Sequence, residues 1–190
     1  MPGIYSGGIR PQNAGVYPGL RISFVGDLAD PASVVVADIA IKTPWISVKG
    51  AASRDMITLS YDSEALKAQH DSVAYCIGQG LAFLGAKHCT VARCRINGSV
   101  SFMQDRWLTG AGISNCEFDT LRRNLIALGA IPGTHGFKVR AFTQRCVIDS
   151  NRVSGTFTQT GNNDGVGRIF YNTSRLLVRD NSWRFEATTH

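Results

Sequence analysis

Charged residues are few in this chain, and the features that mark several large classes of protein are missing. Of its 190 residues, 18% are charged and 44% are hydrophobic, which is typical of folded domains and not of disordered chains. No apolar run is long enough to cross a membrane, and the opening stretch MPGIYSGGIR lacks the apolar segment of a signal peptide. The sequence predicts a protein that is made and kept in a reducing cytoplasm until it is released or assembled.

The common motifs of metal, nucleotide and hydrolase chemistry are missing too. His70, His88 and His135 form no HxH or HExxH spacing, and the five cysteines include no CxxC pair, so we expect no metal site. There is no GxSxG elbow and no phosphate-binding loop, and we expect no cofactor. Five cysteines without zinc spacing are typical of buried free thiols.

Basic residues exceed acidic ones, and most of them are arginine. The net charge of +6 suits a partner that is nucleic acid, acidic glycan or an acidic protein, although it also suits a surface that is only solubilising. The chain has no dense run of Lys and Arg and no known nucleic-acid motif, so nucleic acid is the least favoured of these partners.

Glycine is abundant where charge is not. The 20 glycines, with few long helical patterns, predict a turn-rich, all-β chain. Strands are predicted in four stretches, with the turn DLADPAS between the first two; they are RISFV, SVVVADIAI, WISVKG and MITLS, all between residues 21 and 60. The stretch DSEALKAQ (62–69) predicts one short helix that caps the end of the sheet structure.

A short pattern recurs four times in the second half of the chain. It consists of an apolar residue, two further residues, Cys or Asn, one residue and a second apolar residue. The Cys or Asn positions are Cys94, Cys116, Asn151 and Asn181, at spacings of 22, 35 and 30 residues. The shortest spacing fits one coil of a β-solenoid, and the longer ones leave room for loops at 129–136 and 159–167. We predict that these four side chains stack at a recurring bend as a structural ladder.

The segments that carry this pattern resemble the right-handed parallel β-helix proteins, the architecture of pectate-lyase-like enzymes and phage tailspikes. They are VARCRINGS, ISNCEFDTLRRNLIALG, VIDSNRVSG and LVRDNSWRF, and the resemblance covers residues 87–190, and 45–86 more weakly. It implies an all-β fold, a short right-handed parallel β-helix of about six coils over residues 45–190, with an extended N-terminal arm and one short capping helix. It is specific for fold and says little of function, because this architecture carries many activities.

We expect three parts in the chain. Residues 1–20 hold three prolines and five glycines without periodicity and are predicted to form the extended arm. Residues 21–86 are expected to supply the N-terminal strands and the cap, and residues 87–190 the coils of the β-helix.

The resemblance leaves three hypotheses of function. The first is a structural protein of a bacteriophage virion, either a capsid decoration protein or a tailspike-like appendage, made in the host cytoplasm and expected to be a homotrimer that contacts other virion proteins through residues 1–20. The second is a polysaccharide lyase or glycoside hydrolase, and the third is a carbohydrate-binding module without activity. For binding, the candidates are the outer arginines and one tryptophan, namely Arg93, Arg95, Arg122, Arg152 and Trp107.

The catalytic candidates are acidic residues, one arginine and one histidine. A hydrolase needs two carboxylates that face one cleft, and a lyase needs a base beside a cation that offsets the substrate's charge. The residues that could serve are Glu117, Asp119, Arg122, His135 and Asp164, with Asp149 as a further carboxylate. Each also suits a plain structural position, as a solvated strand residue or a turn former.

Overall fold

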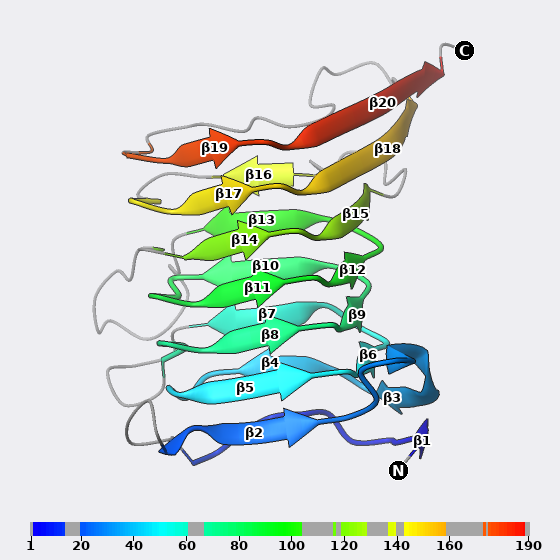
Figure 1. Ribbon diagram of the computed structural model, residues 1–190, viewed down its shortest axis with the longest axis vertical. Helices are drawn as coiled ribbons and strands as arrows, with labels where there is room; N and C mark the ends of the chain where they lie inside the picture. The colour runs from blue at the N-terminus through cyan, green and yellow to red at the C-terminus, as the bar shows by residue number, and fades with distance from the viewer. Residues whose placement is uncertain are drawn as a thin grey trace.

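The protein is built from short parallel β-strands that stack in layers (Figure 1). In this computed structural model the described residues are 2–13, 20–60, 67–103, 116, 119–128, 137–139, 143–158, 173 and 175–188. All pairings between the strands of this described part are parallel. The all-β class expected from the sequence is confirmed, and so is the parallel pairing.

Three sheets contain these strands. In spatial order, the first sheet consists of β1 (Gly3–Ile4), β3 (Val34–Val36), β6 (Ala52–Ser53), β9 (Ile77–Gly78), β12 (Arg95–Ile96), β15 (Leu125–Leu128), β18 (Arg152–Thr158) and β20 (Ser182–Thr188). The second sheet consists of β16 (Phe137–Val139), β13 (Val100–Met103), β10 (Leu81–Leu84), β7 (Ile57–Ser60) and β4 (Ile39–Ile41). The third sheet consists of β19 (Leu177–Arg179), β17 (Val147–Asp149), β14 (Thr120–Arg122), β11 (Thr90–Ala92), β8 (Ser72–Ala74), β5 (Ile46–Lys49) and β2 (Ile22–Val25).

From β2 to β18 the chain visits the three sheets in strict rotation, third, first, second and third again. We call the stretch that adds one strand to each sheet a layer. Each layer pairs in parallel with the layer before it, so the two ends of the chain lie at opposite ends of the stack (Figure 1). In the described part, six strands of the third sheet lie between residues 46 and 179.

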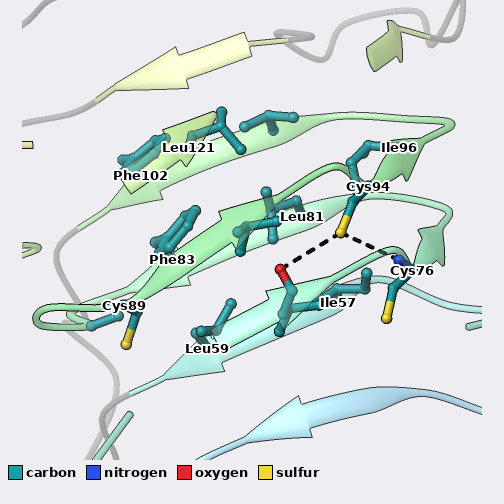
Figure 2. Close-up of a cluster of buried hydrophobic side chains, with 14 of the residues drawn as sticks. Ile57, Leu59, Cys76, Leu81, Phe83, Cys89, Cys94, Ile96, Phe102 and Leu121 are labelled. Atoms are coloured by element: carbon teal, nitrogen blue, oxygen red, sulfur yellow. Dashed lines mark hydrogen bonds between the residues drawn. The ribbon is translucent and has the colours of Figure 1, made fainter. Parts of the chain in front are cut away.

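The core lies between the three sheets and is made of stacked columns of like side chains. In the third sheet, the register of the paired strands places Val73 beside Val91 and Val91 beside Leu121. In the second sheet Phe83 pairs with Phe102, and their rings stack with centroids 4.4 Å apart (Figure 2). These five side chains have no exposed surface. Alternate apolar residues therefore hold each layer on the next, at the strand spacing of about 4.8 Å.

The strands expected between residues 21 and 60 are confirmed as β2, β3 with β4, β5 and β7. The expected turn before β3 contains a single 3-10 turn, Pro31–Ser33. Most of the helix expected over 62–69 lies outside the described residues. Its last residue is not helical, because Gln69 forms a parallel bridge with Lys87. The expected loops at 129–136 and 159–167 also lie outside the described residues.

The described part of the expected N-terminal arm is paired with the sheets. Gly3 and Ile4 pair with β3, and Ile9 bridges Ile39 of β4. Arg10 also holds Asp38 in an ion pair, which fixes this segment to the start of the stack. The β-branched isoleucines and backbone groups of this segment find partners on the sheet edges, and so residues 3–9 lie against the stack.

Strand pairing also continues across the expected boundary at residue 87. Strand β10 pairs with β13, and β8 pairs with β11, in register on both sides of it. The sheets that begin before residue 87 are thus the same sheets that continue after it.

Candidate functional site

Two bends recur from layer to layer, and both use the left-handed backbone conformation. The first bend joins a third-sheet strand to a first-sheet strand, and its φ angles lie between 53° and 69° at Gly50, Tyr75, Arg93, Arg123, Ser150 and Asp180. The second bend precedes a third-sheet strand, with φ between 52° and 64° at Trp45, His70, His88, Arg145 and Arg175. Residues other than glycine rarely adopt this backbone conformation, so the surrounding contacts must hold each bend in place.

A buried ladder runs directly behind the first bend. Its members follow the bend residues in each layer and are Ala51, Cys76, Cys94, Asn124, Asn151 and Asn181. Asn124 Oδ1 accepts the backbone N–H of Cys94 at 2.8 Å, and Asn124 Nδ2 donates to the Val91 carbonyl at 3.1 Å. Asn151 makes the same two contacts one layer later, with the Asn124 N–H at 3.0 Å and the Leu121 carbonyl at 2.9 Å. Each asparagine therefore satisfies buried backbone groups of the layer before it.

The cysteines of this ladder occupy the asparagine positions and contact the equivalent groups. Cys94 Sγ accepts the Cys76 N–H at 3.5 Å and donates to the Val73 carbonyl at 3.7 Å. Figure 2 shows the Cys94 sulfur between the Cys76 nitrogen and a backbone carbonyl. Burial raises the pKa of the Cys94 thiol, and its hydrogen bond with Cys76 adds to the rise. The Cys94 thiol is therefore structural, because a buried neutral thiol is a weak nucleophile.

One of the four predicted ladder residues was assigned wrongly. Cys116 lies before the second bend, fully buried, with its Sγ 3.3 Å from the Phe83 carbonyl. The ladder position of that layer belongs to Asn124, which stands 30 residues after Cys94 and 27 before Asn151. The error arose because a cysteine within an apolar pattern occurs near both bends, and spacing alone does not tell the two apart. Cys94, Asn151 and Asn181 lie where the pattern predicts.

Outward side chains around the first bend are rich in arginine. Arg93 and Arg123 occupy the bend itself, and Arg122 ends β14 beside it. Arg95 and Arg152 begin β12 and β18, on the first-sheet side of the same bend. Strand pairing puts the five in three consecutive layers, and all five are exposed. We call these five residues the arginine corner. Four of them are sequence-predicted binding residues, and the fifth is Arg123.

Few acidic groups compete for the arginine corner within the described residues. The Asp149 carboxylate lies in the next layer, in register with Arg122, and accepts from Arg179 Nε at 3.2 Å. The charges of Arg179 and Arg123 help to lower the pKa of Asp149. Arg93 donates to the Tyr75 hydroxyl, and its guanidinium carbon lies 5.4 Å from that ring's centroid. Among described side chains, Arg95, Arg122 and Arg152 have neither a hydrogen-bond nor an ion-pair partner.

The catalytic candidates do not assemble in the described part of the chain. Asp119 is fully buried, and its Oδ1 accepts the backbone N–H of Cys89 at 2.9 Å. Arg122 lies three residues later and is exposed, so these two side chains do not face a common cleft. The other catalytic candidates, Glu117, His135 and Asp164, lie outside the described residues, and so does the binding candidate Trp107. Asp119 is a ladder residue and not an acid open to substrate.

Asp119 belongs to a second buried ladder, behind the second bend. In the layer before it stands Cys89, whose Sγ lies 3.8 Å from Asp71 Oδ2. Asp71 Oδ1 in turn accepts the Ile46 N–H at 2.6 Å. Burial raises the pKa of the Asp71 carboxyl to about 7. Burial also raises the pKa of the Cys89 thiol, with the carboxyls of Asp119 and Asp71 as further causes. The sequence did not reveal this ladder, because its positions alternate between Asp and Cys.

Three aromatic side chains stack on the outside of the second bend. The rings of Trp45 and His70 lie 4.2 Å apart, and those of His70 and His88 lie 4.7 Å apart. Arg21 donates to the His70 carbonyl at 2.8 Å and lies 5.9 Å from the Trp45 ring centroid. Burial lowers the pKa of His70, and the charges of His88 and Arg21 lower it further. Spacings of 25 and 18 residues hid this stack from sequence analysis.

No group of three or more His, Cys, Asp or Glu side chains in the described part of the chain could hold a metal ion. Among the same residues, no helix is long and apolar enough to cross a membrane. Comparisons with protein-family models, with curated proteins and with solved structures find no match to this chain.

Proposed function

We propose that the protein is a short right-handed parallel β-helix and serves as a structural protein of a bacteriophage particle. The rotation of the chain through three parallel sheets supports the β-helix, and the two ladders supply the side-chain stacking typical of it. In this proposal the protein is a capsid decoration protein or a tailspike-like appendage, trimeric in the virion, and it contacts other virion proteins through its N-terminal end.

The observation that carries the proposal is the apolar surface at the N-terminal end of the stack. Of eight exposed large apolar side chains in the described residues, five lie between residues 4 and 28. They are Ile4 (75% exposed), Tyr5 (43%), Leu20 (63%), Val25 (63%) and Leu28 (50%). We call these five the docking end. Apolar groups gathered at one end of a molecule are typical of an interface with a partner.

The strand edges at the same end support this interpretation. Strand β1 is the terminal strand of the first sheet, and β2 is the terminal strand of the third. Terminal strands have one edge of backbone N–H and C=O groups without a strand partner, and a neighbouring protein can pair with such an edge. The docking end therefore offers both apolar area and hydrogen-bonding groups.

Particle attachment tests the proposal. We expect Ile4→Ser combined with Val25→Ser to lower incorporation into particles by at least about tenfold, because each change removes apolar area from the interface. Strand β1 pairs with β3, so point changes are preferable to deleting residues 1–20. Leu125→Ser with Leu177→Ser is the matched control, because both side chains are exposed elsewhere in the stack, 45% and 44% respectively.

Incorporation is measured by mixing purified protein with particles that lack it, and thermal melting verifies the fold of each variant. Normal incorporation of the Ile4 and Val25 variant would contradict docking through this end. Light scattering on the free protein tests the trimer separately.

A second candidate function is carbohydrate binding, and the arginine corner favours it. The lyase or hydrolase alternative has weaker support, because Asp119 is buried and Arg122 is exposed. Release of unsaturated or reducing sugars from polysaccharide would decide in favour of an enzyme.

A further inference from the structure

We propose that the docking end receives one extended segment of a partner protein, which adds as a further strand to the free edge of β2. The segment has large apolar side chains at alternate positions, and these cover the open end of the core. The inference rests on the proposed function in taking the partner to be a virion protein, and it adds the chemistry by which that partner is recognised.

The backbone of β2 presents a regular row of hydrogen-bonding groups on its free edge. The N–H groups of Ile22 and Gly26 donate to carbonyls in and next to β5, at 3.1 Å and 2.8 Å. Successive residues of a strand direct their N–H and C=O groups to opposite edges, so those of Ser23 and Val25 face away from β5. No strand of the described part pairs with that edge. Two donors and two acceptors are therefore placed for a further strand.

The free edge of β2 lacks the features that commonly protect a terminal strand from other chains. Natural edge strands are often blunted by charged side chains or by proline. The sequence of β2 is Ile-Ser-Phe-Val, which contains neither. At the opposite end of the stack, β19 ends in Arg179 and β20 contains Arg184, both exposed. The uncharged strand edge thus lies at the docking end, as expected of an edge that a partner covers.

The packing between layers is interrupted at β2. A column of inward side chains runs through the seven strands of the third sheet, from Phe24 to Val178. Its five interior members are at most 1% exposed, and they are Val48, Val73, Val91, Leu121 and Ile148. Phe24 is only half-buried, because no described layer lies beyond it. A strand added to β2 would place a residue over Phe24 and so continue the interface that joins each layer to the next.

A hollow of about 510 Å³ opens next to Phe24 at this end of the core. Its walls include Phe24 from the third sheet, Val36 from the first, and Ile9, which bridges the second. The segment 5–8 closes one side, and Arg10 lines the hollow with its charge already balanced by an ion pair. The hollow therefore suits a large apolar side chain rather than an anion.

These features define the partner segment. Residues that lie over Ile22 and Phe24 must be apolar, because these two positions face the core. The residue between them faces outward beside Ser23, which is exposed, and can be polar. The segment is thus a strand of at least about four residues with period-two alternation. Its backbone supplies affinity, and its inward side chains supply specificity.

Binding of a synthetic strand tests the inference without any virion protein. The probe is a fluorescent peptide with the sequence of residues 44–51, because β5 carries Ile46 and Val48 at alternate positions and already pairs with the other edge of β2. Fluorescence anisotropy measures its affinity for the full chain. The control peptide exchanges Ile46 with Ser47 and Val48 with Lys49, which keeps the composition and reverses the alternation. It should bind at least about tenfold more weakly, because its apolar side chains would face outward.

Ser23→Pro tests the backbone pairing from the side of the protein. Proline removes the outward N–H of Ser23 and leaves the bonds to β5 in place, and terminal strands accept proline where the N–H faces solvent. We expect the affinity for the first peptide to fall at least about tenfold. Ser23→Ala keeps the N–H and should change the affinity less than about twofold. Thermal melting verifies the fold of both variants.

Equal affinity for the two peptides overturns the inference, and so does failure of the first peptide to bind. Equal binding by folded Ser23→Pro and Ser23→Ala also overturns it. If Ser23→Pro does not fold, the two peptides on the unaltered chain decide the question.

The outcome is separable from that of the proposed function. Normal incorporation of the Ile4 and Val25 variant together with peptide binding would contradict the virion role and retain strand addition to β2. Lost incorporation of that variant without peptide binding would retain the virion role and contradict strand addition.

Discussion

At the scale of single residues, the interior combines apolar columns with polar groups whose partners are backbone atoms. Asp71 is 2% exposed and accepts the Ile46 N–H, yet its carboxyl has a pKa of about 7. Burial disfavours the charged form by more than this hydrogen bond favours it. The layer that contains Asp71 is therefore stabilised by protonation.

This leads to a prediction for stability against pH. The folded pKa of Asp71, about 7, lies above the value of 3.8 for an unperturbed carboxyl, so the folded state holds the proton more tightly. The contribution of protonated Asp71 to the stability of the fold is fully present below about pH 4 and is lost as the pH rises through 7. We expect Asp71→Asn to remove this dependence and to stabilise the protein at pH 8 by on the order of 3 kcal/mol.

Urea unfolding at pH 5 and pH 8 measures the effect. Asp180→Asn is the control, because Asp180 is an exposed carboxylate at the first bend. A loss of stability between pH 5 and pH 8 that is the same in Asp71→Asn as in the unaltered chain contradicts the assignment to Asp71.

At the scale of the element, the first bend and its ladder form one repeating device. A left-handed residue turns the chain, and the next residue, buried, bonds the backbone of the previous layer. Asparagine makes two such bonds and cysteine makes two longer ones. The ladder therefore accommodates either Asn or Cys from Cys76 onward, whereas an apolar residue at position 151 would leave the Asn124 N–H and the Leu121 carbonyl without partners.

The ladder predicts graded losses of stability. We expect Asn151→Ala to lower the free energy of unfolding by about 2–4 kcal/mol, because the Asn124 N–H and the Leu121 carbonyl lose their partner in the interior. Asn181→Ala should cost less, since Asn181 is only half-buried at the last described layer. Chemical unfolding of the two variants gives the comparison, and equal losses would contradict a role for burial.

The part of the fold that could be predicted from the sequence is the part with local patterns. Alternating apolar residues predicted β2, β5 and β7, and the recurring Asn predicted two ladder positions. The register of the ladder could not be predicted fully, because intervals between equivalent residues range from 18 to 30 in the ladder itself. Left-handed backbone at Tyr75 and Trp45 was also invisible, since neither residue favours it. Contacts between layers, not local preference, impose that conformation.

The arginine corner shows the same division between local and long-range information. Arg93, Arg95, Arg122 and Arg152 were recognisable as outward residues from the strand pattern. Their meeting at one bend in three consecutive layers could be predicted only from the correct ladder register. The assignment of Cys116 to the ladder gave a wrong register. With Asn124 in the ladder, Arg122 and Arg123 fall beside Arg93.

At the scale of the whole molecule, the stack behaves as a one-dimensional array in which each layer contacts only its neighbours. Strands β8, β11 and β14 have a layer on both sides, whereas β2 and β19 are terminal in their sheet. Free energies of local opening should rise from the ends of the stack toward the middle.

Native-state hydrogen exchange tests this distribution. We expect the amides of β11 to exchange on the order of 100-fold more slowly than those of β19, because opening β11 breaks pairing on both of its edges. Uniform protection along the stack would mean that the layers open together.

The direction of the ladder bonds has a consequence for synthesis. The backbone N–H groups that donate to the side chains of Asn124, Asn151 and Asn181 all belong to the preceding layer. A ribosome delivers the chain from its N-terminus, so each nascent layer carries an open donor until the next one emerges. Addition of a layer completes its predecessor, and vectorial growth proceeds in the same direction as the bonding. Translation order and stacking order thus coincide in this molecule.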